Sequence, residues 1–201
     1  MKLYYSPASP FVRKVLVVAH EKRCADRIEI LSSKADPIRT DMSIAADNPL
    51  GQVPTFYTDT GQVLFDSRVI CEYLDAVTGG GLLPTDDTRW SVAVRHSVAD
   101  GILDAALLAR YERVARPPEY RWDAWDDSLM RKIERSLDLL ERDIGDLDGV
   151  VDLGTVAVGC ALGYLDFRFP DYSWRNSHPA LTAWYQKFSE RPSMKLTTPH
   201  T

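Results

Sequence analysis

The first 80 residues change their hydrophobic period repeatedly, which is typical of a chain that alternates strands and helices. Apolar residues at helical spacing predict one helix from Pro10 to near Cys24 and a second that begins at Ser67. Alternating apolar and polar residues predict four short strands, at residues 2–5, 27–31, 54–57 and 62–65. The predicted order is therefore β-α-β followed by β-β-α.

A glycine-rich segment with a proline, residues 78–84, interrupts the chain, and beyond it strand signals nearly vanish. Helical periodicity predicts four helices, at about residues 87–115, 127–145, 153–166 and 178–190. We therefore expect two domains, a small α/β domain at residues 1–78 and an all-helical domain at residues 87–201. There is no internal repeat or low-complexity tract.

Composition and charge narrow the function classes. The 201 residues are 45% apolar, so the chain can bury a hydrophobic core without help from disulfides or bound metals. The formal charge is −5, from 24 basic and 29 acidic residues, and no stripe of Lys and Arg is present to neutralise phosphates. No apolar run approaches the roughly 20 residues that a membrane helix needs. We expect neither nucleic acid nor a membrane as partner.

The cysteines and histidines offer no metal site or disulfide framework. The three cysteines are odd in number and far apart, which favours a reducing, cytoplasmic setting. Cys71 and Cys160 fall on apolar helical faces and are expected to be buried, while Cys24 is expected to be partly exposed. The histidines show no ligand spacing, so we assign no metal: they are His20, His96, His178 and His200.

Ser9 and Pro10 stand where the first strand ends and the first helix begins. Ser suits the N-cap and Pro the first helical position, so Ser9 is expected to cap the helix. A hydroxyl at a helix N-terminus can also donate a hydrogen bond to a thiolate, whose charge the helix dipole favours. One residue can fill both roles.

Two further segments combine capping and turning residues. Pro54 begins a strand, which a cis Val53–Pro54 bond explains; that bond would leave the Val53 N–H and C=O able to hold an extended peptide. An ordinary trans proline at a strand edge is the alternative. Ser67 is an N-cap candidate whose helix start offers backbone N–H groups to a carboxylate, or it caps the helix and does no more.

The chain resembles the cytosolic glutathione transferases over nearly all of its length. The segments that carry the resemblance are 9–14 (SPFVRK), 48–54 (NPLGQVP), Asp66-Ser67 with 71–74 (CEYL), 161–168 (ALGYLDFR) and 178–181 (HPAL). It implies a thioredoxin-like N-terminal domain, a helical C-terminal domain and glutathione as cofactor. It also implies that Val53 pairs with the cysteinyl backbone of glutathione, Asp66 and Ser67 hold its γ-glutamyl end, Gln52 lies near that end, and Ser9 faces the sulfur.

The chain departs from some family patterns. Members that exchange thiols have Cys where Ser9 stands, so a mixed disulfide with glutathione is not expected. Members that use tyrosine place it at the end of the first strand, which makes Tyr5 a second candidate for the sulfur contact, although it also fits a core aromatic. The family's capping box is reversed here as Asp152 and Thr155, which predicts a structural helix cap.

Asp100 follows the linker in a helix segment that resembles one reaching across the dimer in several transferases. There the acid meets the γ-glutamyl ammonium of glutathione bound to the other subunit. Gly101 beside it would permit a close approach between helices. The alternative is a solvated acid on a polar helix face, with Asp104 one turn away.

These features predict a homodimeric glutathione S-transferase that activates the glutathione thiolate for attack on a small apolar electrophile, as in detoxification. The electrophile pocket would be lined by the first helix of the C-terminal domain, where residues 100–115 include Arg110 and Tyr111. The alternative is a binding or regulatory module that keeps the fold without catalysis. Retention on immobilised glutathione would distinguish the two.

Overall fold

The computed structural model describes residues 1–33 and 36–200 as two compact units, one of residues 1–85 and 192–200 and one of residues 86–191. The strands are β1 (Lys2–Tyr5), β2 (Glu29–Ser32), β3 (Thr55–Tyr57) and β4 (Val63–Leu64). The α-helices are α1 (Pro10–Glu21), α2 (Met42–Ala45), α3 (Ser67–Val77), α4 (Arg89–Val114), α5 (Asp123–Arg142), α6 (Leu153–Arg168), α7 (Pro179–Ser189) and α8 (Pro192–Leu196). Four 3₁₀ turns lie at Ala25–Arg27, Pro118–Tyr120, Ile144–Asp146 and Trp174–Asn176.

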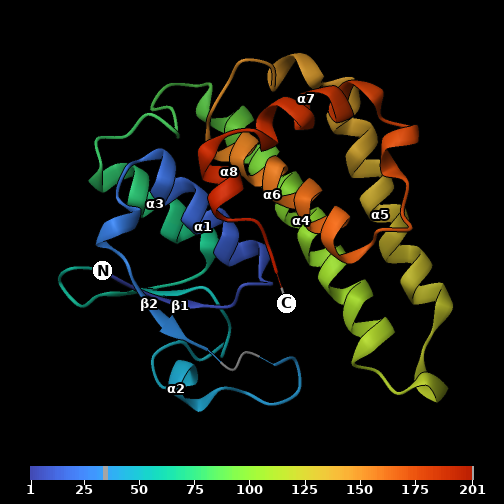
Figure 1. Ribbon diagram of the computed structural model, residues 1–201, viewed down its shortest axis with the longest axis horizontal. Coiled ribbons are helices and arrows are strands. Elements are labelled where there is room, and N and C mark those ends of the chain that lie inside the picture. Colours follow the sequence, from blue (N-terminus) through green and yellow to red (C-terminus); the bar gives the residue numbers. More distant parts are fainter. Residues whose placement is uncertain (34–35, 201) are drawn as a thin grey trace. The chain divides into compact units, whose positions relative to one another are not determined.

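The first unit contains a mixed four-stranded sheet in the order β2-β1-β3-β4. Strand β1 runs parallel to β2 and antiparallel to β3, and β3 runs antiparallel to β4. Helices α1 and α3 pack side by side (Figure 1). The buried side chains of this core include Leu3, Val15, Phe56, Ile70 and Leu74. The predicted β-α-β and β-β-α order is confirmed.

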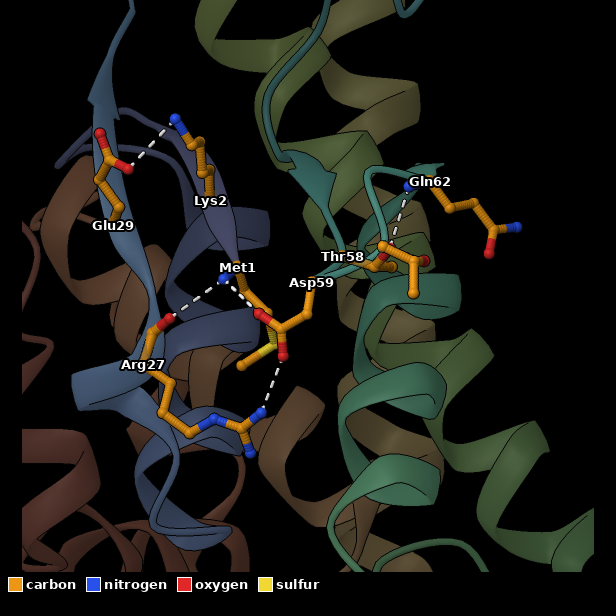
Figure 2. Close-up of polar contacts among 8 residues, drawn as sticks. Met1, Lys2, Arg27, Glu29, Thr58, Asp59 and Gln62 are labelled. Carbon is orange, nitrogen blue, oxygen red and sulfur yellow. Dashed lines mark hydrogen bonds and ion pairs between the residues drawn. The ribbon is translucent and has the colours of Figure 1, made fainter.

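A polar cluster lies at the end of this sheet where β1 and β2 begin and β3 ends. The Asp59 carboxylate, in the turn between β3 and β4, lies 2.8 Å from the Met1 ammonium and 2.8 Å from the Arg27 guanidinium (Figure 2). The hydrogen bond from the N-terminus is the main cause that lowers the pKa of the Asp59 carboxyl. Asp59 thus joins the turn between β3 and β4 to the residues that precede β1 and β2.

The second unit is built around α6, whose residues 153–165 are all buried. Helices α4 and α7 both contact α6, and α5 contacts α4 and α7. The Asp152 carboxylate caps α6 by accepting from Thr155 N–H at 2.7 Å, while the Thr155 hydroxyl accepts from Asp152 N–H at 2.9 Å. Arg95 of α4 lies 2.6 Å from the same carboxylate. The reversed capping box is confirmed.

Several boundaries differ from the prediction. Helix α5 begins at Asp123 rather than at 127, because the buried Glu112 carboxylate accepts from Trp122 N–H at 2.8 Å and fixes the chain just before it. Helix α2, within a segment read as polar and broken, and α8 are too short to show a period.

The end of the chain also lies elsewhere than expected. Residues from Pro192 onward were assigned to the helical domain at 87–201, whereas the structure groups them with the first unit. Helix α8 packs on α1, and Arg13 donates to the Met194 carbonyl at 3.2 Å. This grouping depends on contacts between residues about 180 positions apart, which leave no local signal.

We predict that Gly154→Ala destabilises the protein by about 1–3 kcal/mol, as expected for overpacking. An added methyl carbon would lie 2.9 Å from the Val92 carbonyl oxygen, a backbone atom that cannot move aside easily. The control is Gly145→Ala, whose methyl would meet nothing within 4 Å and should change stability by no more than about 0.5 kcal/mol. Urea unfolding followed by circular dichroism compares the two, and equal effects would contradict the close α4–α6 contact.

Candidate functional site

Ser9 caps helix α1 as predicted. Its backbone is extended, with φ −80° and ψ 119°, and its Oγ accepts from Val12 N–H at 3.3 Å. Because capping uses a lone pair of the oxygen, the hydroxyl proton remains available to donate. The hydroxyl donates to no other group among the described residues, and the side chain is only partly buried.

Tyr5 ends β1, four positions before Ser9, and is also partly buried. Burial raises the pKa of its phenol, so the hydroxyl stays protonated and is a donor at neutral pH. The structure therefore keeps Tyr5 as the second candidate for a contact with sulfur.

The loop before β3 is held by Asn48, which is 1% exposed. Its amide donates to the Thr55 hydroxyl at 2.8 Å and to the Gln52 carbonyl at 3.3 Å, and its own oxygen accepts from Leu50 N–H at 3.1 Å. Gly51 in this loop has φ +60°, and an added Cβ would lie 2.7 Å from Thr40 Cγ2. The backbone path from 48 to 55 is thus fixed by buried hydrogen bonds and a glycine.

The Val53–Pro54 bond is cis, which confirms that prediction, and so is the Phe65–Asp66 bond. Neither the N–H nor the C=O of Val53 is hydrogen-bonded to any of the residues 1–33 and 36–200. Both groups are available to an extended ligand, which can pair with them as an added strand does.

The structure corrects the N-cap that the sequence suggested for α3. Asp66, not Ser67, is the N-cap of α3: its carboxylate accepts from Arg68 N–H at 2.9 Å, and Ser67 is the first helical residue. Ser67 is 2% exposed, and its hydroxyl has no hydrogen-bond partner among the described residues. An exposed carboxylate and a helix N-terminus therefore stand together, one suited to an ammonium and the other to a carboxylate.

The strand register brings these three segments to one end of the sheet. Tyr4 pairs with Thr55, so the end of β1 lies beside the start of β3. Phe56 pairs with Leu64 and the strands are antiparallel, so the end of β4 lies at the same end. Ser9, Val53 and Ser67 each lie within four residues of these strand ends. Residues 1–85 thus collect a hydroxyl donor, an unpaired backbone segment and two helix N-termini.

Asp100 lies in the second unit and is not a solvated acid. It is 6% exposed, and its carboxylate lies 3.5 Å from Nε2 of His96, one turn earlier on α4. Helix α4 contacts both α5 and α6, so more than one of its faces is buried. This packing explains why Asp100 is not exposed to solvent. An added Cβ at Gly101 would meet nothing within 4 Å among the described residues, so Gly101 serves no close approach between helices there.

All three cysteines are buried, and they are thiols rather than members of disulfides. This confirms the expectation for Cys71 and Cys160 and corrects it for Cys24, which is 2% exposed. The chain turns back at Arg23, with φ 53°, and Cys24 N–H donates to the Ala19 carbonyl at 2.9 Å, so the thiol points into the unit. Burial raises the pKa of the Cys24 thiol and suppresses its thiolate.

Acidic side chains and a histidine meet in the second unit in a way that sequence spacing did not reveal. Ligand atoms of Glu134, Asp138 and His178 lie within 4.8 Å of one another. Hydrogen bonds already occupy them: His178 Nδ1 bonds the Trp174 carbonyl at 2.7 Å, and the Tyr172 hydroxyl donates to Glu134. A third contact, 3.1 Å between His178 Nε2 and Asp138 Oδ1, joins α5 to the residue just before α7.

Burial, followed by the charge of Arg110, lowers the pKa of the Arg168 guanidinium in the second unit, which the sequence analysis did not anticipate. Arg110 of α4 was noted only as part of the expected electrophile pocket, and Arg168, the last residue of α6, only as part of a family motif. A charged residue that ends an almost entirely apolar helix was the available signal.

Family models match both units. The N-terminal domain model of glutathione S-transferases matches residues 8–77, and the C-terminal domain model matches residues 105–187. The uncharacterised GST-like protein YibF of Escherichia coli K12 is 37% identical, and the match covers 99% of this chain and 98% of YibF. The chain belongs to the glutathione S-transferase family, with its thioredoxin-like N-terminal and helical C-terminal domains. No helix among the described residues is both long and apolar enough to cross a bilayer.

Two solved structures are especially similar, both of a glutathione transferase family member from Pseudomonas fluorescens Pf-5. One contains bound glutathione; it is 46% identical, covers 100% of this chain and 99% of its own, and has a TM-score of 0.97. The other contains bound S-(propanoic acid)-glutathione; it is 45% identical, covers 100% of both chains, and has a TM-score of 0.92.

Proposed function

We propose that this protein is a glutathione transferase that binds glutathione in its first unit and directs the thiolate at a small apolar electrophile. The observation that carries the proposal is the Ser9 hydroxyl, which caps α1 with its oxygen and keeps its proton for a thiolate. Bound glutathione in a family member that is 46% identical over the whole chain supports the choice of thiol.

In this proposal the tripeptide lies along the end of the sheet. The cysteinyl backbone pairs with the Val53 N–H and C=O, which have no partner among the described residues. The γ-glutamyl carboxylate lies at the N-terminus of α3, where Ser67 adds a hydroxyl, and the γ-glutamyl ammonium faces Asp66. Gln52 contributes near the same group, and Pro54 fixes the direction of the chain after Val53.

The Ser9 hydroxyl and the dipole of α1 can together supply the free energy needed to ionise the glutathione thiol. A free thiol titrates near pKa 8.5, so thiolate at neutral pH needs a shift of about 2 units, or roughly 2.7 kcal/mol. One charge-assisted hydrogen bond supplies about 1.5–3 kcal/mol, and the dipole of α1 adds about 0.3–1 kcal/mol. A general base is not required.

Conjugation, rather than thiol exchange, is the reaction that the residues favour. Exchange requires an attacking thiolate at the pocket, and the cysteines of this chain are buried. Binding of S-(propanoic acid)-glutathione by the similar protein supports a site that accepts a substituent on the sulfur. We further propose that the protein works as a homodimer in the cytoplasm.

We predict that glutathione binds the wild-type protein and that Ser67→Ala weakens this binding about 10- to 150-fold, as for the loss of a hydrogen bond to a charged group, which contributes about 1.5–3 kcal/mol. Isothermal titration calorimetry measures both. The control is Ser91→Ala, whose exposed hydroxyl bonds only the Thr88 carbonyl, and it should bind as the wild type does. If glutathione fails to bind the wild type, the protein is a non-catalytic member that kept the fold.

We predict that Asp100→Asn weakens glutathione binding by about 1 kcal/mol or more without dissociating the dimer. The reason is that a carboxylate contributed by one subunit would face the γ-glutamyl ammonium bound to the other. Calorimetry, with the mass in solution checked alongside, tests this. Unchanged affinity in an intact dimer would leave Asp100 with only its structural contact to His96.

A further inference from the structure

Two carboxylates and a buried imidazole converge within the second unit. Glu134 and Asp138 lie one turn apart on α5, and His178 is the residue just before α7. Ligand atoms of the three side chains lie within 4.8 Å of one another, and residues 1–33 and 36–200 hold no other group of three His, Cys, Asp or Glu side chains arranged in this way. Asp138 and His178 are 40 positions apart, so no spacing along the chain shows the group.

The hydrogen bonds of His178 decide which of its ring nitrogens carries a proton. The side chain is fully buried, and Nδ1 lies 2.7 Å from the carbonyl oxygen of Trp174. A carbonyl oxygen only accepts hydrogen bonds, so Nδ1 is the donor. In a neutral ring Nε2 then presents its lone pair, and Nε2 lies 3.1 Å from Oδ1 of Asp138. Histidines that bind metals are held in this way, with one nitrogen donating to a carbonyl and the other facing the ion.

Other residues orient the two carboxylates without neutralising them. Tyr172 donates to Oε2 of Glu134; burial, followed by this hydrogen bond, raises the pKa of the Tyr172 phenol, which therefore remains a donor. Among the described residues, Oε1 of Glu134 and Oδ2 of Asp138 accept no hydrogen bond, and neither acid forms an ion pair with Lys or Arg. Like charges four positions apart on a helix repel each other. A cation between them would remove this repulsion.

The spacing of the ligand atoms fits a small metal ion. Nitrogen and oxygen ligands lie about 2.0–2.2 Å from zinc in a tetrahedral site, so two of them are roughly 3.3–3.5 Å apart. The 3.1 Å between His178 Nε2 and Asp138 Oδ1 is close to that spacing. Glu134 projects from the same face of α5 as Asp138. The Asp138 side chain is 64% exposed, which gives an ion a route from solvent.

We propose that Glu134, Asp138 and His178 bind a divalent metal ion that prefers mixed nitrogen and oxygen ligands, such as Zn²⁺, with water completing its coordination. The imidazole nitrogen disfavours Mg²⁺ and Ca²⁺, which prefer oxygen ligands alone. The ion would connect α5 to the residue before α7, where Glu141 of α5 already accepts from Leu181 N–H at 2.7 Å. Its role is structural, and the inference does not depend on the proposed function.

Calorimetric titration of chelator-treated, untagged protein with Zn²⁺, without glutathione and at slightly alkaline pH, tests the site. We expect one ion to bind per chain with a micromolar Kd, and the midpoint of thermal unfolding to rise with Zn²⁺ concentration, because only the folded chain assembles the three ligands. Mg²⁺ at the same concentrations should leave the midpoint unchanged. The cysteines are buried and do not compete for the ion in the folded protein.

Two variants identify the ligands. Asp138→Asn and Glu134→Gln should each lower the affinity for Zn²⁺ about tenfold or more, because a neutral amide replaces a charged ligand. Both are expected to fold, since Asp138 is exposed and glutamine can still accept from Tyr172. The control is Asp127→Asn, which removes another exposed acid of α5 that has no ion pair among the described residues, and it should bind Zn²⁺ as the wild type does.

Nitrogen-15 spectra of the histidine rings supply a measurement on the wild-type protein alone. Zn²⁺ should shift the Nε2 resonance of His178 and leave its Nδ1 proton in place. If the wild type binds no Zn²⁺, His178 and Asp138 form only a hydrogen-bonded pair, and the inference is overturned. Binding that is equally tight in both ligand variants would also overturn it, because the ion would then lie elsewhere on the surface.

Discussion

The hydrogen bond from Val12 N–H to Ser9 Oγ fixes the place where β1 gives way to α1, and the rest of the site is arranged around this helix start. It holds Ser9 in an extended conformation, directs the first turn of α1, and leaves the hydroxyl proton unused by the described residues. Pro10 strengthens the arrangement, because its missing N–H is one that the first turn cannot satisfy anyway. The helix cap and the proposed thiolate donor are therefore one hydroxyl, whose oxygen accepts from Val12 N–H and whose proton can be donated.

The sheet brings this helix start together with the other two segments that are proposed to bind glutathione. Because β3 is antiparallel to both β1 and β4, the loop at Val53 and the N-terminus of α3 come to the same end as Ser9. The Asn48 hydrogen bonds and the positive φ of Gly51 then hold the loop that presents Val53. In the second unit, α6 is a buried helix whose cap residue, Asp152, also forms an ion pair with Arg95 of α4.

Local signals made much of the fold predictable. The Ser9-Pro10 start, the cis Val53–Pro54 bond and the Asp152 cap each depend on a few adjacent residues, and each is confirmed. Where two capping residues stand together, as at Asp66 and Ser67, sequence could not decide which one caps the helix.

Tertiary contacts account for what the sequence did not reveal. The burial of Cys24, the burial of Asp100 and the return of α8 to the first unit depend on residues far along the chain or on neighbouring helices. The roles of Ser9, Tyr5, Gln52, Val53, Asp66, Ser67 and Asp100 toward glutathione stay predictions.

The most direct test of the account is the pKa of the glutathione thiol when bound, followed by the ultraviolet absorbance of the thiolate against pH. We predict that this pKa lies near or below 7 in the wild-type protein and rises by about 1–2 units in Ser9→Ala, as for the loss of one charge-assisted bond. Tyr5→Phe, which removes the other candidate hydroxyl, should leave the titration unchanged. A titration unaffected by Ser9→Ala but shifted by Tyr5→Phe would contradict the account and assign the thiolate to Tyr5.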